Sequence, residues 1–295
     1  LKHIESVEAI SAFEGSNIFI SQQQEISKSE LPPTIDFSIS LHAQYGSVLL
    51  VNGERNESYI SDIQHFRRRE TIAMTPINCL AALKTLIEKS SFDPTNTNIE
   101  INKAVVLDSI AAITGTNTKA LAGSSGLSVQ YAIMMGLVHH ALENHEGKAI
   151  KFIVPPNCYG GTNDQARRVA ACLDNVEVVD LLVDGEFDMV QSIDMVLAKI
   201  ANEDAIPYII AEIPTNPRVE VPDLIKLKEV LSVERKTSKG ETAIDPVFIL
   251  DQTFCPNVHF LGEGEMLSTV RTISYASGSK FPSGGQCTSG YCVGN

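Results

Sequence analysis

Five short apolar runs, rich in β-branched residues, recur along the second half of the chain. They cover residues 149–156, 176–184, 205–213, 246–254 and 269–277. Their nearly continuous apolar character is typical of strands that are covered on both faces, as in a parallel sheet. We therefore predict five strands at these positions.

The segments between these runs carry apolar residues at helical spacing. We predict helices over Leu127–Asn144, Asp164–Leu173, Met189–Ala201 and Leu224–Arg235. Strands that alternate with helices in this way predict an α/β fold with three layers, a mostly parallel sheet flanked by helices. In such sheets ligands bind at the carboxyl ends of the strands.

The first part of the chain is less regular. Residues 35–51 have strand character, and residues 57–70 and 77–89 are patterned as helices. The polar segment 232–245 is expected to end a helix and continue as an exposed excursion. We predict an N-terminal segment of uncertain structure over residues 1–60 and a large domain over residues 61–295. Both ends look cut, so we expect a fragment of a longer protein.

Composition restricts the class of function. The chain has 295 residues and a formal net charge of −13, which argues against a nucleic-acid partner. No segment is apolar for long enough to cross a bilayer, and the start of the sequence lacks the apolar core of a secretory signal. The six cysteines are scattered and show no CxxC spacing. We expect reduced thiols, no zinc site, no membrane partner and a cytoplasmic protein.

Two glycine-containing motifs follow predicted strands or precede helices. AGSSGLSVQ, residues 122–130, would present the N–H groups of Gly126 and Leu127 at the positive end of a helix dipole, which suits a phosphate. A glycine turn that merely caps a helix is the alternative. In CYGGT, residues 158–162, the ring of Tyr159 could stack on a flat ligand. A turn with a half-buried tyrosine is the alternative there.

Two further motifs carry charge. Asp251 ends an apolar strand, where a carboxylate is costly to bury unless it meets a cation or a donor. It could partner a protonated ring nitrogen, or simply cap a helix. Lys280 lies among small residues, including Ser277 and Ser279. Desolvation would favour its neutral amine, which can form a Schiff base. A surface lysine in a loop is the alternative.

Taken together and in order, these motifs resemble the Cys/Met-metabolism family of pyridoxal-phosphate enzymes, which have the aspartate-aminotransferase fold (fold type I). The family shows a serine-glycine turn, Tyr-Gly-Gly-Thr, Glu-x-Pro-Thr-Asn-Pro, Asp-Asn-Thr, and Ser-x-Thr-Lys followed by Gly-Gly. This chain has SSGL, YGGT, EIPTNP, DQTF and SGSKFPSGG, within residues 120–295. The resemblance implies a pyridoxal 5'-phosphate-binding large domain. It also implies that a small C-terminal domain, with the arginine for the substrate carboxylate, is missing from this chain.

The resemblance also implies roles for individual residues. Lys280 would bind the cofactor as a Schiff base and move protons, and Asp251 would keep the pyridine nitrogen protonated. Tyr159 would stack on the ring and assist the leaving group, and Asn216 would hydrogen-bond the ring hydroxyl oxygen. Glu212 matches a family position without a firm role. The phosphate would be held by a set of four residues: Gly126, Leu127, Ser277 and Ser279.

Several positions depart from the family pattern. The Asn after the Asp is Gln252, the Thr before the Lys is Ser279, and the usual Gly-His-Ser-Asp is replaced by Gly285-Gln286-Cys287-Thr288. The family's Tyr-x-Arg, which reaches a neighbouring subunit's phosphate, has no clean match. The nearest candidate is the segment His65-Phe66-Arg67-Arg68-Arg69, which could equally be a solvated basic helix face.

The resemblance implies an amino-acid substrate and γ-replacement on an activated homoserine, as in cystathionine γ-synthase. It also implies a homodimer or homotetramer. Elimination by a C–S lyase of the same family is the first alternative. A lapsed homologue that binds the cofactor without turnover is the second, and an aminotransferase is the third.

Overall fold

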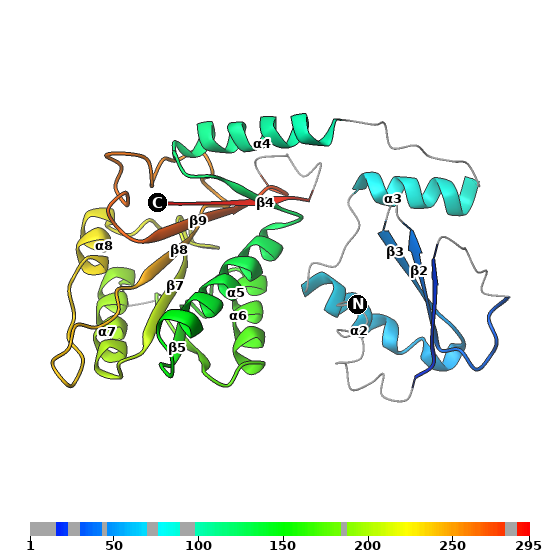
Figure 1. Cartoon of the computed structure of the whole chain (residues 1–295), viewed down its shortest axis with the longest axis horizontal. Helices are drawn as coiled ribbons and strands as arrows, with labels where there is room; N and C mark the ends of the chain where they lie inside the picture. The colour runs from blue at the N-terminus through cyan, green and yellow to red at the C-terminus, as the bar shows by residue number, and fades with distance from the viewer. Residues whose placement is uncertain are drawn as a thin grey trace. The chain divides into compact units, whose positions relative to one another are not determined.

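The computed structural model describes residues 16–22, 30–42, 46–69, 76–88, 98–183, 188–280 and 288–295. The chain divides into two compact units, Leu1–Thr97 and Asn98–Asn295 (Figure 1). The predicted division at residue 60 does not coincide with this boundary. The reason is that helical residues after position 60 pack on the preceding strands. Ala81 and Ala82, for example, pack against Val48.

The smaller unit contains a three-stranded sheet in the order β1-β2-β3. Strand β1 is parallel to β2, and β2 and β3 are antiparallel. The elements of this unit are β1 (Ile18–Gln22), β2 (Phe37–His42), β3 (Gly46–Val51), η3 (Glu54–Asn56), α2 (Tyr59–Arg69), α3 (Pro76–Leu83) and the π-helical turn η4 (Lys84–Glu88). The strand character of residues 35–51 and the helical pattern of residues 57–70 and 77–89 are thus confirmed in the described ranges.

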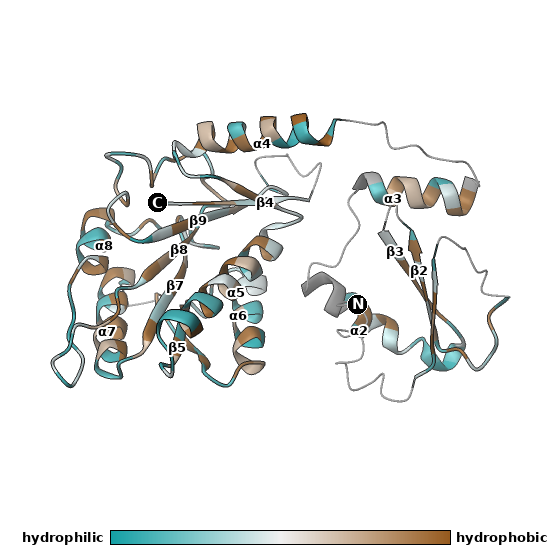
Figure 2. Cartoon of the chain, viewed as in Figure 1, coloured by the Kyte–Doolittle hydropathy of each residue, from teal (hydrophilic) through white to brown (hydrophobic). Residues whose placement is uncertain are grey.

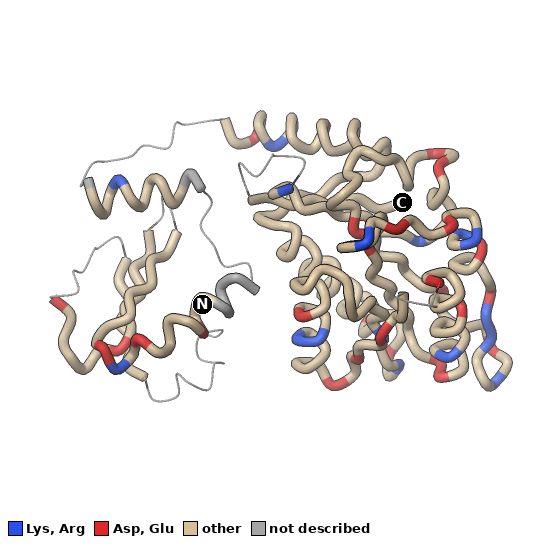
Figure 3. Tube along the Cα trace, turned by 180° about the vertical axis from the view of Figure 1, so that it is seen from behind, with Lys and Arg blue, Asp and Glu red and all other residues tan. Residues whose placement is uncertain are grey.

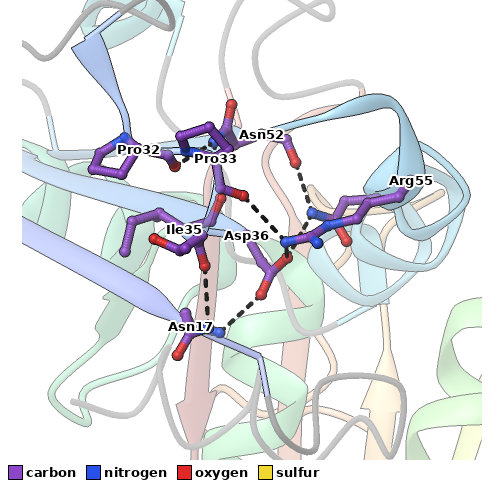
Figure 4. A network of polar contacts seen from close by, with 9 residues as sticks. Asn17, Pro32, Pro33, Ile35, Asp36, Asn52 and Arg55 are labelled. Carbon is purple, nitrogen blue, oxygen red and sulfur yellow. Dashed lines mark hydrogen bonds and ion pairs between the residues drawn. The ribbon is translucent and has the colours of Figure 1, made fainter.

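A polar network centred on Asp36 joins the ends of these strands (Figure 4). The Asp36 carboxylate accepts the N–H of Asn17 at 3.0 Å, Nη2 of Arg55 at 2.6 Å and Nδ2 of Asn56 at 2.9 Å. The hydrogen bond from Asn17 is the largest cause that lowers the Asp36 pKa. Nδ2 of Asn52 donates to the Ile35 carbonyl at 2.8 Å. The network is satisfied internally and therefore has a structural role.

The larger unit is built on a seven-stranded sheet in the order β4-β10-β9-β8-β7-β5-β6. Strands β5 to β9 run parallel, whereas β10 pairs antiparallel with β9 and β4. The strands are β4 (Leu121–Gly123), β5 (Ile150–Val154), β6 (Val176–Asp180), β7 (Ile206–Glu212), β8 (Val247–Asp251), β9 (Thr272–Ser277) and β10 (Gly290–Gly294). The five predicted strands are confirmed, while β4 and β10 were not predicted.

Helices cover both faces of this sheet, which confirms the three-layer α/β fold (Figure 1). They are α4 (Ile99–Thr114), α5 (Gly126–Asn144), α6 (Gly160–Ala171), α7 (Met189–Asn202) and α8 (Leu224–Leu231). The four predicted helices are confirmed within a few residues, except that α8 ends at Leu231, before the predicted Arg235. Helix α4 was not predicted.

The apolar strand residues alternate between two core clusters, as the period of two in a strand requires. Ile210 and Ile249 pack with side chains of α5 and α6, whereas Ile209 and Phe248 pack with side chains of α7 and α8. Figure 2 shows the hydrophobic residues concentrated along these strands and the helix sides that face them. The inner strands β5, β7 and β8 are thus buried on both faces, which explains why they are almost wholly apolar.

The described residues contain no long apolar helix of the kind that could span a membrane. Within the same ranges, no group of three or more His, Cys, Asp and Glu side chains could hold a metal ion, and the five described cysteines form no disulfide with one another. The sixth, Cys287, lies outside the described residues. Figure 3 shows Lys and Arg interspersed with Asp and Glu along the described part of the larger unit.

Helix α7 provides a test of the core. Ile193 is fully buried and Met195, two residues further along, is 61% exposed. We expect Ile193→Ala to lower the free energy of unfolding by about 2–5 kcal/mol, because it removes buried methyl groups and leaves a cavity. Met195→Ala should change it by no more than about 0.5 kcal/mol. Urea unfolding followed by circular dichroism measures both, and equal effects would contradict the assigned packing.

Candidate active site

Three side chains form a row across the carboxyl ends of neighbouring strands. In the parallel registers, Glu212 of β7 pairs with Asp251 of β8, and Asp251 pairs with Tyr275 of β9. Paired residues of neighbouring strands point to the same face of a sheet. Tyr275 packs with the cluster on the α5 and α6 side, so the row lies on that face.

The two carboxyl groups of this row are buried without a cationic partner among the described residues. Glu212 is 6% exposed and Asp251 is 8% exposed. Burial raises the pKa of Asp251, against the opposing effect of hydrogen bonds from Thr253. Burial, together with the charge of Asp251, raises the pKa of Glu212 to about 7. Two adjacent buried carboxyls of this kind favour a ligand that brings a positive charge or an N–H donor.

The sequence analysis left Glu212 without a role, but the structure gives it two hydrogen-bond partners. Its Oε1 accepts the backbone N–H of Tyr159 at 2.8 Å, and its Oε2 accepts the backbone N–H of Asn216 at 3.1 Å. Glu212 therefore joins the segment after β5 to the segment after β7. Asn216 itself is half-buried.

Asp251 is joined to the end of β9 through Thr253. The N–H of Thr253 donates to Asp251 Oδ1 at 2.9 Å, and Thr253 Oγ1 accepts the N–H of Ser277 at 3.0 Å. The hydroxyls of Ser277 and Ser279 lie 2.8 Å apart. The predicted residues Asp251, Ser277 and Ser279 are therefore brought together.

The first turn of α5 reaches the same place. A Cβ added at Gly126 would lie 2.7 Å from Cβ of Ser277, so only glycine allows this approach. Ser125 and Ser128 form a capping box, in which each side chain accepts the other's backbone N–H, at 3.1 and 2.9 Å. The N–H groups of Gly126 and Leu127 belong to the same first turn, where a helix has no acceptors of its own. This turn and the Ser277 and Ser279 hydroxyls together form a set of donors suited to an anion.

Tyr159 is 46% exposed and precedes α6 as its N-cap residue. Its ring borders Gly161, where an added Cβ would lie 2.6 Å from Tyr159 Cε1 and 3.1 Å from Leu127 Cδ1. The Tyr159 ring and the Leu127 side chain therefore both lie close to Gly161 and crowd the space that a side chain there would need. An exposed aromatic face beside the α5 turn is available to a ligand ring.

A buried network beneath the row was missed from the sequence. The Tyr275 hydroxyl donates to Gln130 Oε1 at 3.1 Å, and the Thr162 hydroxyl donates to the same oxygen at 3.0 Å. Burial, and next the charge of Asp251, raise the pKa of Tyr275 well above its usual value, so its hydroxyl stays protonated. A polar residue within the apolar face of a helix, as Gln130 is, was the available signal.

Lys280 is exposed and makes no hydrogen bond or ion pair with another described residue. It lies just after Ser277 and Ser279, while β9 ends closely packed: a Cβ at Gly278 would lie 1.9 Å from Ser289 Oγ. The structure therefore places Lys280 at the same end of the sheet as Asp251 and Ser277. Of the small residues that were expected to surround it, Ser283, Gly284 and Gly285 lie outside the described residues.

The residues that depart from the family pattern lie in different parts of the structure. Gln252 serves the loop after β8: its Nε2 donates to the carbonyls of Cys255 at 3.2 Å and Val258 at 2.9 Å, and its Oε1 accepts the Ser274 hydroxyl. Of the stretch 285–288, only Thr288 is described. The backbone of residues 65–69 is part of α2, in the smaller unit, and the side chains of these residues lie outside the described ones.

Comparison with known proteins shows similarity only at the level of solved structures. No family model and no curated protein matches the sequence. Similar structures include cystathione gamma lyase (CalE6) from Micromonospora echinospora (TM-score 0.44, covering 63% of this chain and 40% of that one) and metB from Corynebacterium glutamicum (0.43, 64% and 41%). Another is apo CalE6, described as a methionine gamma lyase (0.43, 63% and 42%). Each is 19% identical, and the chain spans about two fifths of their lengths.

The raised Glu212 pKa predicts a dependence of stability on pH. Between its ordinary value of 4.5 and about 7, the folded chain keeps a proton on Glu212 that the unfolded chain has lost. Folding therefore becomes less favourable as the pH rises through this window. We expect the free energy of unfolding of the wild type to fall between pH 5 and pH 8, and Glu212→Gln to make this fall smaller by about 2–3 kcal/mol.

Urea unfolding at the two pH values measures this difference. Glu220→Gln is the control, because the Glu220 side chain is 57% exposed, and this variant should keep the wild-type dependence on pH. If Glu212→Gln lost as much stability as the wild type over this range, Glu212 would not be the responsible group.

Proposed function

We propose that this chain is the cofactor-binding part of a pyridoxal-phosphate-dependent enzyme of sulfur amino-acid metabolism. The observation that carries the proposal is the buried pair Glu212 and Asp251, which has no cationic partner among the described residues. It lies beside an anion-suited helix terminus at Gly126. Pyridoxal phosphate has both complementary groups, a ring nitrogen that can be protonated and a phosphate.

The residues fit the ring nitrogen at Asp251. The Asp251 carboxyl is buried, its Oδ1 accepts the N–H of Thr253, and burial raises its pKa. A ring N–H would provide the charged partner that the described residues do not supply, and would lower that pKa. When bound, pyridoxal phosphate supplies an electron sink for a carbanion next to the amino nitrogen of the substrate.

The phosphate would be held by the N–H groups of Gly126 and Leu127 and the hydroxyls of Ser277 and Ser279. The close approach of Gly126 to Ser277 supports this assignment, because it places two independent sets of donors together. A phosphate fixed there would orient the ring relative to Asp251 and lower the entropic cost of reaction. We assign ring stacking and assistance to the leaving group to Tyr159, and the ring hydroxyl contact to Asn216.

Lys280 is the amine that we assign to covalent attachment of the cofactor and to proton transfer at the substrate. Its place after Ser279, at the carboxyl end of β9, supports this role. Transfer of protons requires an amine that can alternate between its neutral and charged forms. We assign this work to Lys280 because the carboxyl of Asp251 is committed to the ring nitrogen.

For the reaction itself we propose γ-replacement on an activated homoserine, to give cystathionine or a related thioether, in a cytoplasmic homodimer or homotetramer. The motifs YGGT and EIPTNP support the sulfur branch of the family. Elimination by a C–S lyase is the alternative, because one set of pocket residues serves both reactions. The exposed side chain of Lys280 favours a second alternative, a lapsed homologue that binds the cofactor without turnover.

Covalent trapping tests the assignment of Lys280. We expect the chain incubated with pyridoxal 5'-phosphate to become yellow, and borohydride reduction to fix the cofactor on the peptide that contains Lys280, as found by mass spectrometry. Lys280→Ala should abolish this adduct. The control Lys199→Ala should retain the adduct, because Lys199 is a surface lysine of α7 with a side chain that is 73% exposed. Protein that stays colourless, or an adduct spread over surface lysines, would overturn the proposed function.

Substrate assays then separate the reactions. Cofactor-loaded protein should convert O-acylhomoserine in the presence of cysteine if it catalyses replacement. Release of ammonia and an oxoacid from cystathionine or methionine without added thiol would indicate elimination. Loaded protein that leaves all three substrates unchanged would favour the lapsed homologue. These assays need the full-length protein, because the given chain spans about two fifths of the similar structures.

A further inference from the structure

Glu212 connects two loops that belong to different parts of the candidate site. It is the last residue of β7, between β5 and β8 in the sheet. One carboxylate oxygen accepts the N–H of Tyr159 and the other accepts the N–H of Asn216, at 2.8 and 3.1 Å. A single buried side chain thus holds the backbone at both positions.

The loop after β7 is attached at its first residue, where the Ile213 N–H donates to the Asp251 carbonyl at 3.3 Å and the Cys255 thiol donates to the Ile213 carbonyl at 2.8 Å. Beyond Ile213 few backbone donors are left for the sheet. Pro214 and Pro217 have no N–H, and the N–H of Thr215 donates to Glu220 within the same loop, at 2.9 Å. The N–H of Asn216 is therefore the donor that attaches this stretch to Glu212. On the other side, the N–H of Tyr159 lies at the N-cap of α6, outside the hydrogen bonds of the helix.

Only an ionised carboxylate can accept both N–H groups well, because a carboxamide or a protonated acid offers one good acceptor oxygen. The groups that act electrostatically on Glu212 are Asp251 of β8, Cys158 after β5 and Tyr275 of β9. None of them is cationic. Because the Glu212 pKa is about 7, this carboxyl changes from its protonated to its ionised form near neutral pH.

We infer that Glu212 is a positioning residue, which holds the Tyr159 and Asn216 segments in place through its two carboxylate oxygens. The hydrogen-bonding role of Glu212 does not depend on the proposed function. Its importance for the ring of pyridoxal phosphate rests on the proposed function, which places the Tyr159 ring and the Asn216 side chain against that ring.

Amide hydrogen exchange, measured by NMR on the 295-residue chain without cofactor, tests the hydrogen-bonding role. At pH 8 we expect Glu212→Gln to lower the protection of the Tyr159 or the Asn216 amide by about tenfold, because a hydrogen bond to a charged acceptor is lost. The Phe248 amide, which donates to the backbone carbonyl of Arg271 at 2.9 Å near the start of β8, is the internal control. Glu220→Gln, in the same loop, is the matched variant and should behave as the wild type.

The wild type provides a second measurement that needs no mutation. After correction for intrinsic exchange, we expect protection at Tyr159 or Asn216 to rise about tenfold from pH 6 to pH 8, relative to the Phe248 amide. This readout remains decisive if Glu212→Gln fails to fold. Unchanged protection of both amides, in the variant at pH 8 or in the wild type between the two pH values, would overturn the inference.

Titration with pyridoxal 5'-phosphate, followed by absorbance, tests the link to the cofactor. If the wild type binds it, Glu212→Gln should raise the Kd by about tenfold or more, while Glu220→Gln leaves it unchanged. Equal Kd values for Glu212→Gln and the wild type would overturn the link. A wild type that takes up no cofactor would overturn the proposed function instead, and the exchange measurements would still decide whether Glu212 holds the two segments.

Discussion

Two carboxyl groups are buried side by side at the ends of β7 and β8, and the described residues offer them no cation. Such burial is unfavourable by itself, because desolvation penalises each charge and each charge penalises the other. Backbone N–H groups donate hydrogen bonds to both carboxyls. Those of Tyr159 and Asn216 donate to Glu212, and that of Thr253 donates to Asp251. These hydrogen bonds lower the two pKa values, yet both remain raised. The site therefore still favours a positively charged group, such as the protonated ring nitrogen of the proposed cofactor.

The parallel sheet explains why so many separate segments meet at this pair. Strands β5, β7, β8 and β9 are adjacent and run in one direction, so the segments that leave their carboxyl ends lie at the same edge. The α5 turn joins them because Gly126 has no side chain to hold it away from Ser277. Anion donors, an exposed aromatic ring and buried carboxyls are thereby gathered at one edge of the sheet.

In the proposed function, different parts of the site bind the cofactor and move protons. The groups proposed to bind the phosphate and the ring nitrogen lie at a helix terminus and at strand ends. Lys280 lies shortly after the end of β9 at Ser277, and its side chain is exposed. A side chain that moves protons benefits from such freedom, whereas the groups that orient a ring benefit from fixed positions. Glu212 joins the Tyr159 and Asn216 segments, and we infer that its ionisation controls how firmly these two segments are held.

The sequence by itself determined the five central strands and the helices between them, because continuous apolar runs and helical spacing are local consequences of burial on both faces. It also indicated Asp251, Ser277 and Lys280, through motifs at strand ends. Strands β4 and β10 were not predicted, because β4 has only three residues, β10 begins and ends with glycine, and both pair with segments distant in the chain. The role of Glu212 and the network of Gln130 with Tyr275 were decided by the tertiary structure alone. Their partners are distant in the chain, and only the register of the sheet and the packing of α5 on it bring them within hydrogen-bonding distance.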